Sequence, residues 1–134
     1  MPDSRTSLPI LPIDVSHDSY YRIDYFSEHL PHPLETTVGS FDGVEGIFGT
    51  KFPGQRWHTK SITVDEWSEI VDAIAKFGFW TMPESAPPRA IGGGAWRVEA
   101  SIGNKRHVIF RINPELHEDE KAFMEMLNLL RRKG

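Results

Sequence analysis

Between residues 64 and 77, apolar residues recur at the spacing of an α-helix, and this pattern predicts the first helix of the chain. The apolar stripe consists of Trp67, Ile70, Val71, Ile74 and Phe77. Thr63 and Glu66 form a capping-box sequence, in which hydroxyl and carboxylate each bond a free amide of the first turn. We therefore expect a helix that begins at Thr63 or Val64 and ends by Gly78, with Trp67, Ile70, Val71 and Ile74 buried.

Residues 94–112 alternate between apolar and polar positions, which predicts a β-hairpin, but two registers fit the sequence. The alternating apolar residues are Trp96, Val98, Ala100 and Ile102, then Val108, Phe110 and Ile112. A two-residue turn at Gly103-Asn104 pairs Ile102 with Lys105 and places His107 and Arg111 on the face of Val98. A three-residue turn at 103–105 pairs Ile102 with Arg106 and gathers the apolar residues on one face. Because burial normally sets register, we predict the three-residue turn.

The remaining sequence predicts a β-meander, a second helix and an irregular N-terminal segment. Residues 34–60 read as strands separated by turns at Asp42-Gly43 and Pro53-Gly54. The second helix follows Pro114, and its stripe is Phe123, Met124, Leu127 and Leu130. Three prolines interrupt residues 1–18, and the apolar positions that follow fit a short helix or an edge strand.

The order of these elements is meander, helix, long loop, hairpin and helix, which predicts the α+β class. We expect an antiparallel sheet, made of the meander and the C-terminal hairpin, with two main helices packed on one face. A chain of 134 residues has the size of one domain, so we take residues 1–134 as a single domain. In this interpretation residues 34–134 form the α+β core, and residues 1–33 are an irregular, proline-rich segment.

Residues 77–130 carry a pattern of several short motifs. Trp96-x-x-Glu99 is followed by His107-x-x-x-Arg111-x-x-Pro114 and an apolar helix. Gly78-Phe79-Trp80 and Gly92-Gly93-Gly94 precede this hairpin. The pattern resembles a set of small, uncharacterised bacterial domains to which no activity is attached. The resemblance implies a shared hairpin-and-helix structure and assigns no catalytic residue.

The composition narrows the classes of partner. The net charge is −4, and neither half of the chain is strongly basic, so we expect no nucleic-acid partner. The sequence contains no cysteine, which excludes disulfides and thiolate zinc sites. It has no apolar stretch of about 20 residues and no signal-peptide pattern, so we expect no membrane association and a cytoplasmic location.

The outward face of the predicted hairpin carries the strongest candidate chemistry. In the predicted register, Arg97, Glu99, His107 and Arg111 share this face, with Glu99 diagonal to His107 and Arg111. A carboxylate between an imidazole and a guanidinium can bind an anion or move a proton. The alternative is a solvated sheet face with exposed ion pairs. We favour this alternative, because no nucleophile or second carboxylate accompanies the group, and we assign no catalytic residue.

Two further motifs are weaker. His29 and His32 have metal-like spacing, but two imidazoles fall short of the four ligands of a structural zinc site. Gly92-Gly93-Gly94 leads into a strand, whereas phosphate loops lead into a helix with a Lys and a Ser or Thr. We therefore expect no metal and no cofactor.

These observations favour a protein-binding module over an enzyme. The aromatic residues that fall outside the predicted apolar stripes fit a hydrophobic core and a protein interface equally well. We expect the contact surface to combine the acidic edge of the first helix, with Glu69 and Asp72, and the glycine-rich loop beside Trp80. A small acidic domain of this kind fits an immunity protein or another inhibitor of a bacterial toxin, with a basic protein as its partner. The alternative is a small enzyme or ligand-binding domain that uses the face of Glu99, His107 and Arg111.

Overall fold

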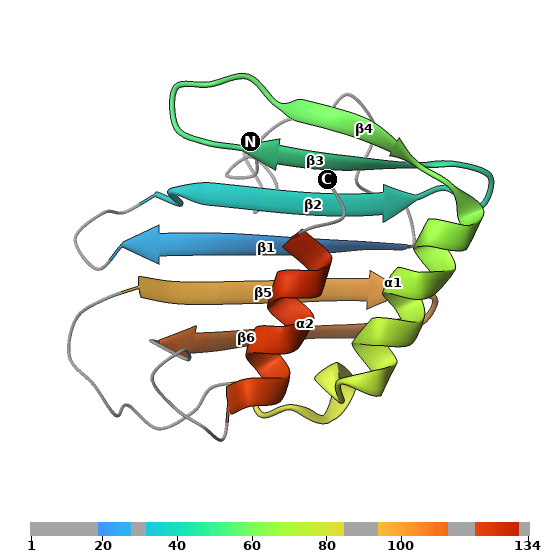
Figure 1. Ribbon diagram of the computed structural model, residues 1–134. Coiled ribbons are helices and arrows are strands. Elements are labelled where there is room, and N and C mark those ends of the chain that lie inside the picture. The colour runs from blue at the N-terminus through green and yellow to red at the C-terminus, as the bar shows by residue number, and fades with distance from the viewer. Residues whose placement is uncertain (1–18, 28–31, 85–93, 113–119, 132–134) are drawn as a thin grey trace, which may run out of the picture.

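The computed structural model describes residues 19–27, 32–84, 94–112 and 120–131. Its six strands form one antiparallel sheet in the order β4-β3-β2-β1-β5-β6 (Figure 1). The strands are β1 (Ser19–Ser27), β2 (Glu35–Phe41), β3 (Gly46–Lys51), β4 (His58–Ile62), β5 (Gly94–Ile102) and β6 (Lys105–Ile112). The helices are α1 (Val64–Lys76), the short 3-10 helix η2 (Phe79–Thr81) and α2 (Lys121–Arg131).

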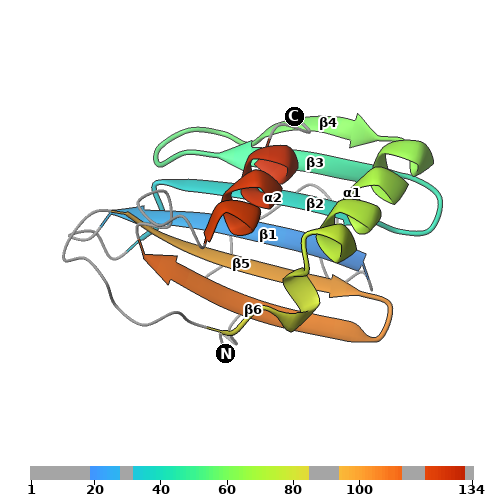
Figure 2. The ribbon, with the colours of Figure 1, turned by 60° about the horizontal axis from the view of Figure 1, so that its bottom comes forward.

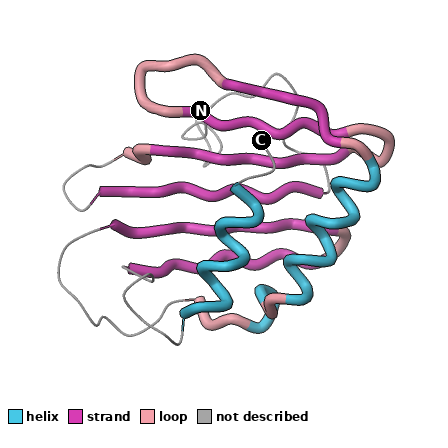
Figure 3. The backbone as a smooth tube through the Cα atoms, in the orientation of Figure 1, coloured by secondary structure: helices cyan, strands magenta, loops and turns pink. Residues whose placement is uncertain are grey.

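Helices α1 and α2 both cover one face of the sheet, and the two layers enclose the hydrophobic core (Figures 2 and 3). Apolar side chains from both helices meet those of the strands there, including Tyr21, Ile23, Trp67, Ile70, Val98, Ile109, Phe123 and Leu127. We call the opposite side of the sheet, which neither α1 nor α2 covers, the open face. The predicted α+β class is confirmed, with a meander and a hairpin in the sheet and both helices on one side.

Strand β1 corrects the expectation for the N-terminal segment. Residues 19–27 form a central strand between β2 and β5, not a short helix, an edge strand or an irregular segment. Tyr21 and Ile23 face the helices and are buried, whereas Arg22 and Asp24 face the other way. The alternation was hidden because apolar Tyr20 and Phe26 also lie on the polar side of the strand. Residues 1–18 lie outside the described part of the chain.

Tyr21 shows why this strand lies at the centre. Its ring occupies the space over Gly39, where an added Cβ would collide with it. Its hydroxyl donates a hydrogen bond of 2.9 Å to the carbonyl of Leu130 in α2. The ring thus fills a space that only glycine leaves open, and it joins β1, β2 and α2.

Helix α1 follows the sequence prediction closely. It begins at Val64 after the N-cap Thr63, and the capping box is formed. The amide of Glu66 donates to Thr63 Oγ1 at 3.1 Å, and the amide of Thr63 donates to Glu66 Oε1 at 2.9 Å. Gly78 adopts a left-handed φ of 78° after the helix. Trp67, Ile70 and Ile74 are buried as expected, while Val71 is only half-buried.

The hairpin has the register of a two-residue turn, not that of the predicted three-residue turn. Ile102 pairs with Lys105, and Gly103 has a left-handed φ of 62°, so the turn is the two-residue one. Val98 lies opposite Ile109, and Phe110 and Ile112 point to the open face with 49% and 51% of their surface exposed. The prediction that Val108, Phe110 and Ile112 share the core face is therefore wrong.

The physical reason is that the core side of β6 accommodates two polar residues, His107 and Arg111. His107 Nε2 lies 2.6 Å from the carbonyl oxygen of Met82, and its ring meets the Phe79 ring edge-on at 5.3 Å. The buried Arg111 forms an ion pair of 2.9 Å with Glu120. Because β6 is an edge strand, only part of its length lies over the core, and polar partners replace apolar burial there.

Candidate functional site

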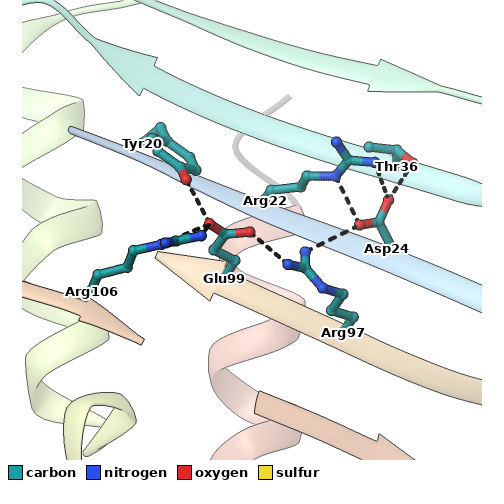
Figure 4. Close-up of polar contacts among 7 residues, drawn as sticks. All are labelled: Tyr20, Arg22, Asp24, Thr36, Arg97, Glu99 and Arg106. Carbon is teal, nitrogen blue, oxygen red and sulfur yellow. Dashed lines mark hydrogen bonds and ion pairs between the residues drawn. The ribbon is translucent and has the colours of Figure 1, made fainter. Parts of the chain in front are cut away.

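The open face carries a group of charged and hydroxyl side chains that lie across β1, β2, β5 and β6 (Figure 4). We call it the open-face network; its members are Tyr20, Arg22, Asp24, Thr36, Arg97, Glu99 and Arg106. Strand register places Arg22 opposite Glu99 and Asp24 opposite Arg97. Opposite charges therefore alternate both along and across the two strands, which is the favourable arrangement for a sheet face.

Asp24 is the first centre of the network. Its oxygens accept hydrogen bonds from Arg22 Nε at 2.8 Å, Arg22 Nη2 at 3.0 Å and Thr36 Oγ1 at 2.6 Å. Arg97 Nη1 adds an ion pair at 3.8 Å. All three partners of the carboxylate are fixed on strands, and both Asp24 and Arg22 are buried. Hydrogen bonds from charged and hydroxyl donors compensate this carboxylate for the water that it loses on burial.

Glu99 is the second centre. It accepts a hydrogen bond of 2.6 Å from the Tyr20 hydroxyl and one of 2.8 Å from Arg97 Nη2. Arg106 donates through Nη2 at 2.8 Å and Nε at 3.2 Å. Arg97 thus bridges Glu99 and Asp24 and joins the two halves into one network.

Electrostatics keeps Glu99 ionised and Tyr20 protonated. Burial raises the pKa of Glu99, but hydrogen bonds from Tyr20, Arg106 and Arg97 outweigh burial and lower it. Burial, the hydrogen bond to Glu99 and the charge of Glu99 raise the pKa of Tyr20 to about 12. A carboxylate with a lowered pKa is a weak base, and a phenol with a raised pKa is a poor nucleophile near pH 7. The network is therefore better suited to holding the strands together and keeping a fixed pattern of charge than to transferring protons.

The predicted cluster of Glu99, His107 and Arg111 does not form. Glu99 lies on the open face, while His107 and Arg111 lie on the helix side of β6. Of the predicted hairpin residues, only Arg97 contacts Glu99, and Arg106 takes the place expected of His107. The cause is the one-residue change of register, which exchanges the faces of all β6 side chains.

Glu69 and Asp72 lie where the sequence placed them, exposed on α1. Asp65 is also exposed, and the three acids follow the i, i+4, i+7 spacing of one helix face. We call Asp65, Glu69 and Asp72 the acidic row. It faces away from the sheet, because Trp67, Ile70 and Ile74 on the other side of the helix are buried in the core.

Trp80 does not lie beside the start of β5. It stands on η2 against Phe79, and Lys105 Nζ lies 5.7 Å from its ring centroid. Lys105 starts β6, whereas Gly94, the described end of the glycine-rich stretch, starts β5 and packs against Tyr25 at the far end of the hairpin. Gly92 and Gly93 lie outside the described residues. The joint surface of glycine-rich loop and Trp80 is therefore not supported at Gly94.

Five members of the network were not predicted from the sequence: Tyr20, Arg22, Asp24, Thr36 and Arg106. The signal for β1 was the alternation of charge at Arg22 and Asp24 with apolar Tyr21 and Ile23. The register of the hairpin decides whether Arg106 or His107 approaches Glu99, so Arg106 could be predicted only with the correct turn.

The described residues can also be searched for a metal site and for a helix that could span a membrane. They contain no group of three or more His, Asp or Glu side chains arranged to hold a metal ion. His32 is exposed, and His29 lies outside the described part. Among the helices of the described ranges, none is both long enough and apolar enough to cross a bilayer.

Comparison with known proteins gives no relative from which a function is transferred: no protein-family model matches the chain, and no curated protein is significantly similar to it.

Proposed function

We propose that this protein is a non-enzymatic binding module that uses the acidic row of α1 to engage a basic protein. An immunity protein or another inhibitor of a bacterial toxin, acting in the cytoplasm, is the form of this proposal that fits a small acidic domain. The observation that carries it is the exposure of Asp65, Glu69 and Asp72 on one outward face of α1.

The position of these acids supports a role beyond helix stability. Acidic residues stabilise a helix near its N-terminus, where the dipole is positive, and Asp65 and Glu66 already lie in the first turn. Glu69 and Asp72 lie beyond that turn, and like charges three residues apart repel weakly. A row of one sign on the surface attracts an oppositely charged protein and speeds its encounter.

The open-face network argues for binding over catalysis as well. Glu99 is occupied by three donor side chains, and its lowered pKa makes it a weak base. His107 and Arg111, which the enzyme hypothesis required beside it, are on the other face of the sheet.

Affinity capture with matched variants tests the proposal. The wild-type protein, the Glu69→Lys/Asp72→Lys variant and a control are immobilised and exposed to the same lysate. The control, Glu84→Lys/Glu125→Lys, makes the same change of net charge at two exposed acids outside the row. We expect a basic protein to be captured by the wild type and the control and to be lost by the row variant. Equal capture by all three proteins would contradict a role for the acidic row.

A further inference from the structure

A pocket of about 180 Å³ lies beside the Asp24 half of the open-face network, because Arg22 and Thr36 of that half also line the pocket. The described residues that line it are Arg22, His32, Pro33, Thr36, Lys51, Phe52 and Pro53. The cationic side chains come from strands β1 and β3, and the apolar ones come from the segments before β2 and after β3. The pocket thus combines fixed positive charge with an apolar wall.

Arg22 is held in a fixed orientation at the pocket. Asp24 accepts hydrogen bonds from its Nε and Nη2 atoms, which occupy one edge of the guanidinium. Only 6% of the surface of Arg22 is exposed, and the residue lines the pocket. Within the described part of the chain, Nη1 makes no hydrogen bond, so the second edge of the planar group remains available to the pocket. An oriented guanidinium edge matches the two oxygens of a carboxylate.

Lys51 provides a second donor and fixes the pocket's mouth. Its Nζ donates to the carbonyl of Gln55 at 2.8 Å and lies 3.5 Å from that of Phe52. An ammonium group has three N–H donors, so at least one remains for a ligand. The same bonds hold the turn after β3, which carries Phe52 and Pro53. The site is therefore formed before a ligand arrives.

Charge and size select the class of ligand. Among the described residues at the pocket, Arg22 and Lys51 contribute two positive charges and Asp24, which holds Arg22, contributes one negative charge. Arg97 lies closer to Glu99, at 2.8 Å, than to Asp24, at 3.8 Å, so we count it with Glu99, and the balance at the pocket without His32 is +1. This balance suits a monoanion better than phosphate. A cavity of about 150 Å³ accommodates a benzene ring, so about 180 Å³ accepts one small apolar body.

We propose that this pocket binds a small carboxylate that carries an apolar body, either as a free acid or as the C-terminal residue of a peptide. Arg22 and Thr36 place the site on the open face. The helix that bears the acidic row covers the other face of the sheet (Figure 2), and the site does not depend on the proposed function of that row.

Titrations followed by NMR of the backbone amides test this site. Sodium benzoate is the probe, and sodium chloride at equal ionic strength is the control. We expect benzoate to shift the amides of Lys51, Phe52 and Thr36 with saturation, and chloride to leave them without a saturating shift. Inorganic phosphate should bind more weakly than benzoate. Phosphate that binds more tightly, or shifts that chloride reproduces, would overturn the proposal.

Variants separate the pocket from general charge. Lys51→Gln should weaken benzoate binding about tenfold, since it removes one charged donor. Lys105→Gln, which makes the same charge change on the β5–β6 hairpin, should bind benzoate like the wild type. Arg22→Lys should abolish binding, and Lys51→Gln keeps the proposal testable if loss of Arg22 unfolds the protein. Equal affinities for Lys51→Gln and Lys105→Gln would refute the site.

Two peptides distinguish the sources of the carboxylate. One ends in a free phenylalanine carboxylate, and the other is the same peptide with an amidated end. If the free peptide binds more tightly than benzoate and the amidated one does not bind, the ligand is a chain terminus. If benzoate binds and the free peptide does not, the ligand is a free acid. Binding of the amidated peptide as tightly as the free one would contradict recognition of a carboxylate.

Discussion

Replacing Glu99 with glutamine tests whether the open-face network stabilises the fold. The substitution keeps the shape of the side chain and one acceptor oxygen, but it removes the charge and turns an NH₂ group toward an arginine. A hydrogen bond to a charged group contributes about 1.5–3 kcal/mol, and we expect the loss of one such bond with Arg97. The Arg106 pair adds about 0.5 kcal/mol, because the Arg106 side chain is 66% exposed. The free energy of unfolding should therefore fall by about 2–3.5 kcal/mol.

Urea unfolding measured between pH 3 and pH 8 gives this difference and its pH dependence. The folded pKa of Glu99 lies below its unfolded value of about 4.3, so its ionised form stabilises the fold above that pH. This contribution is lost as the pH falls through the folded pKa, and the gap between wild type and Glu99→Gln should shrink there. Arg106→Gln is the control, with an expected loss of about 0.5 kcal/mol. A loss below about 0.5 kcal/mol for Glu99→Gln, or a gap that stays constant to pH 3, would refute the reasoning.

Three further predictions test other parts of the structure. Thr63→Ala should lower the free energy of unfolding by about 0.5–2 kcal/mol through loss of the cap, and an unchanged denaturant midpoint would contradict the capping role. The difference between ultraviolet titrations of the wild type and Tyr20→Phe should show a tyrosine pKa of about 12, and a transition near 10 would contradict this. The contribution of protonated Tyr20 to stability is fully present below the unfolded pKa of about 10 and is lost as the pH rises through about 12. Phe110→Ser should lower the free energy of unfolding by at most about 1 kcal/mol and Ile109→Ala by about 2–5 kcal/mol. A larger loss for Phe110→Ser than for Ile109→Ala would support the three-residue turn instead.

Helix α1 was predictable because its signals are local. The cap, the apolar stripe and the terminating Gly78 all lie within one short stretch of chain, and each agrees with the others. No partner distant in sequence was needed to place the ends of the helix. Only Val71 differed, because it lies at the margin of the buried stripe.

The hairpin shows where local reasoning fails. Maximum apolar burial predicted one register, but the Gly103-Asn104 turn set the other. The choice depended on Met82, Phe79 and Glu120, which supply partners for His107 and Arg111 on the core side of β6. Those partners are distant in sequence, so the hydrophobic pattern alone did not reveal them.

The acidic row and the open-face network differ in the same respect: the first depends on local spacing and the second on pairing between distant segments. The acidic row follows from helix spacing, and the sequence predicted the exposure of Glu69 and Asp72. The open-face network needs β1 between β2 and β5, because Tyr20 reaches Glu99 across 79 residues of chain. A pairing at that separation is decided by the topology of the sheet, which the order of elements did not specify.

The most direct test of a binding role for the acidic row is the rate of association with the basic protein captured by the wild type. Stopped-flow measurements at several salt concentrations compare the wild type, Glu69→Lys/Asp72→Lys and Glu84→Lys/Glu125→Lys. We predict that the row variant associates about tenfold more slowly at low salt, that the gap narrows as salt screens the charges, and that the control stays close to the wild type. Equal slowing in both variants, or a gap independent of salt, would contradict the account.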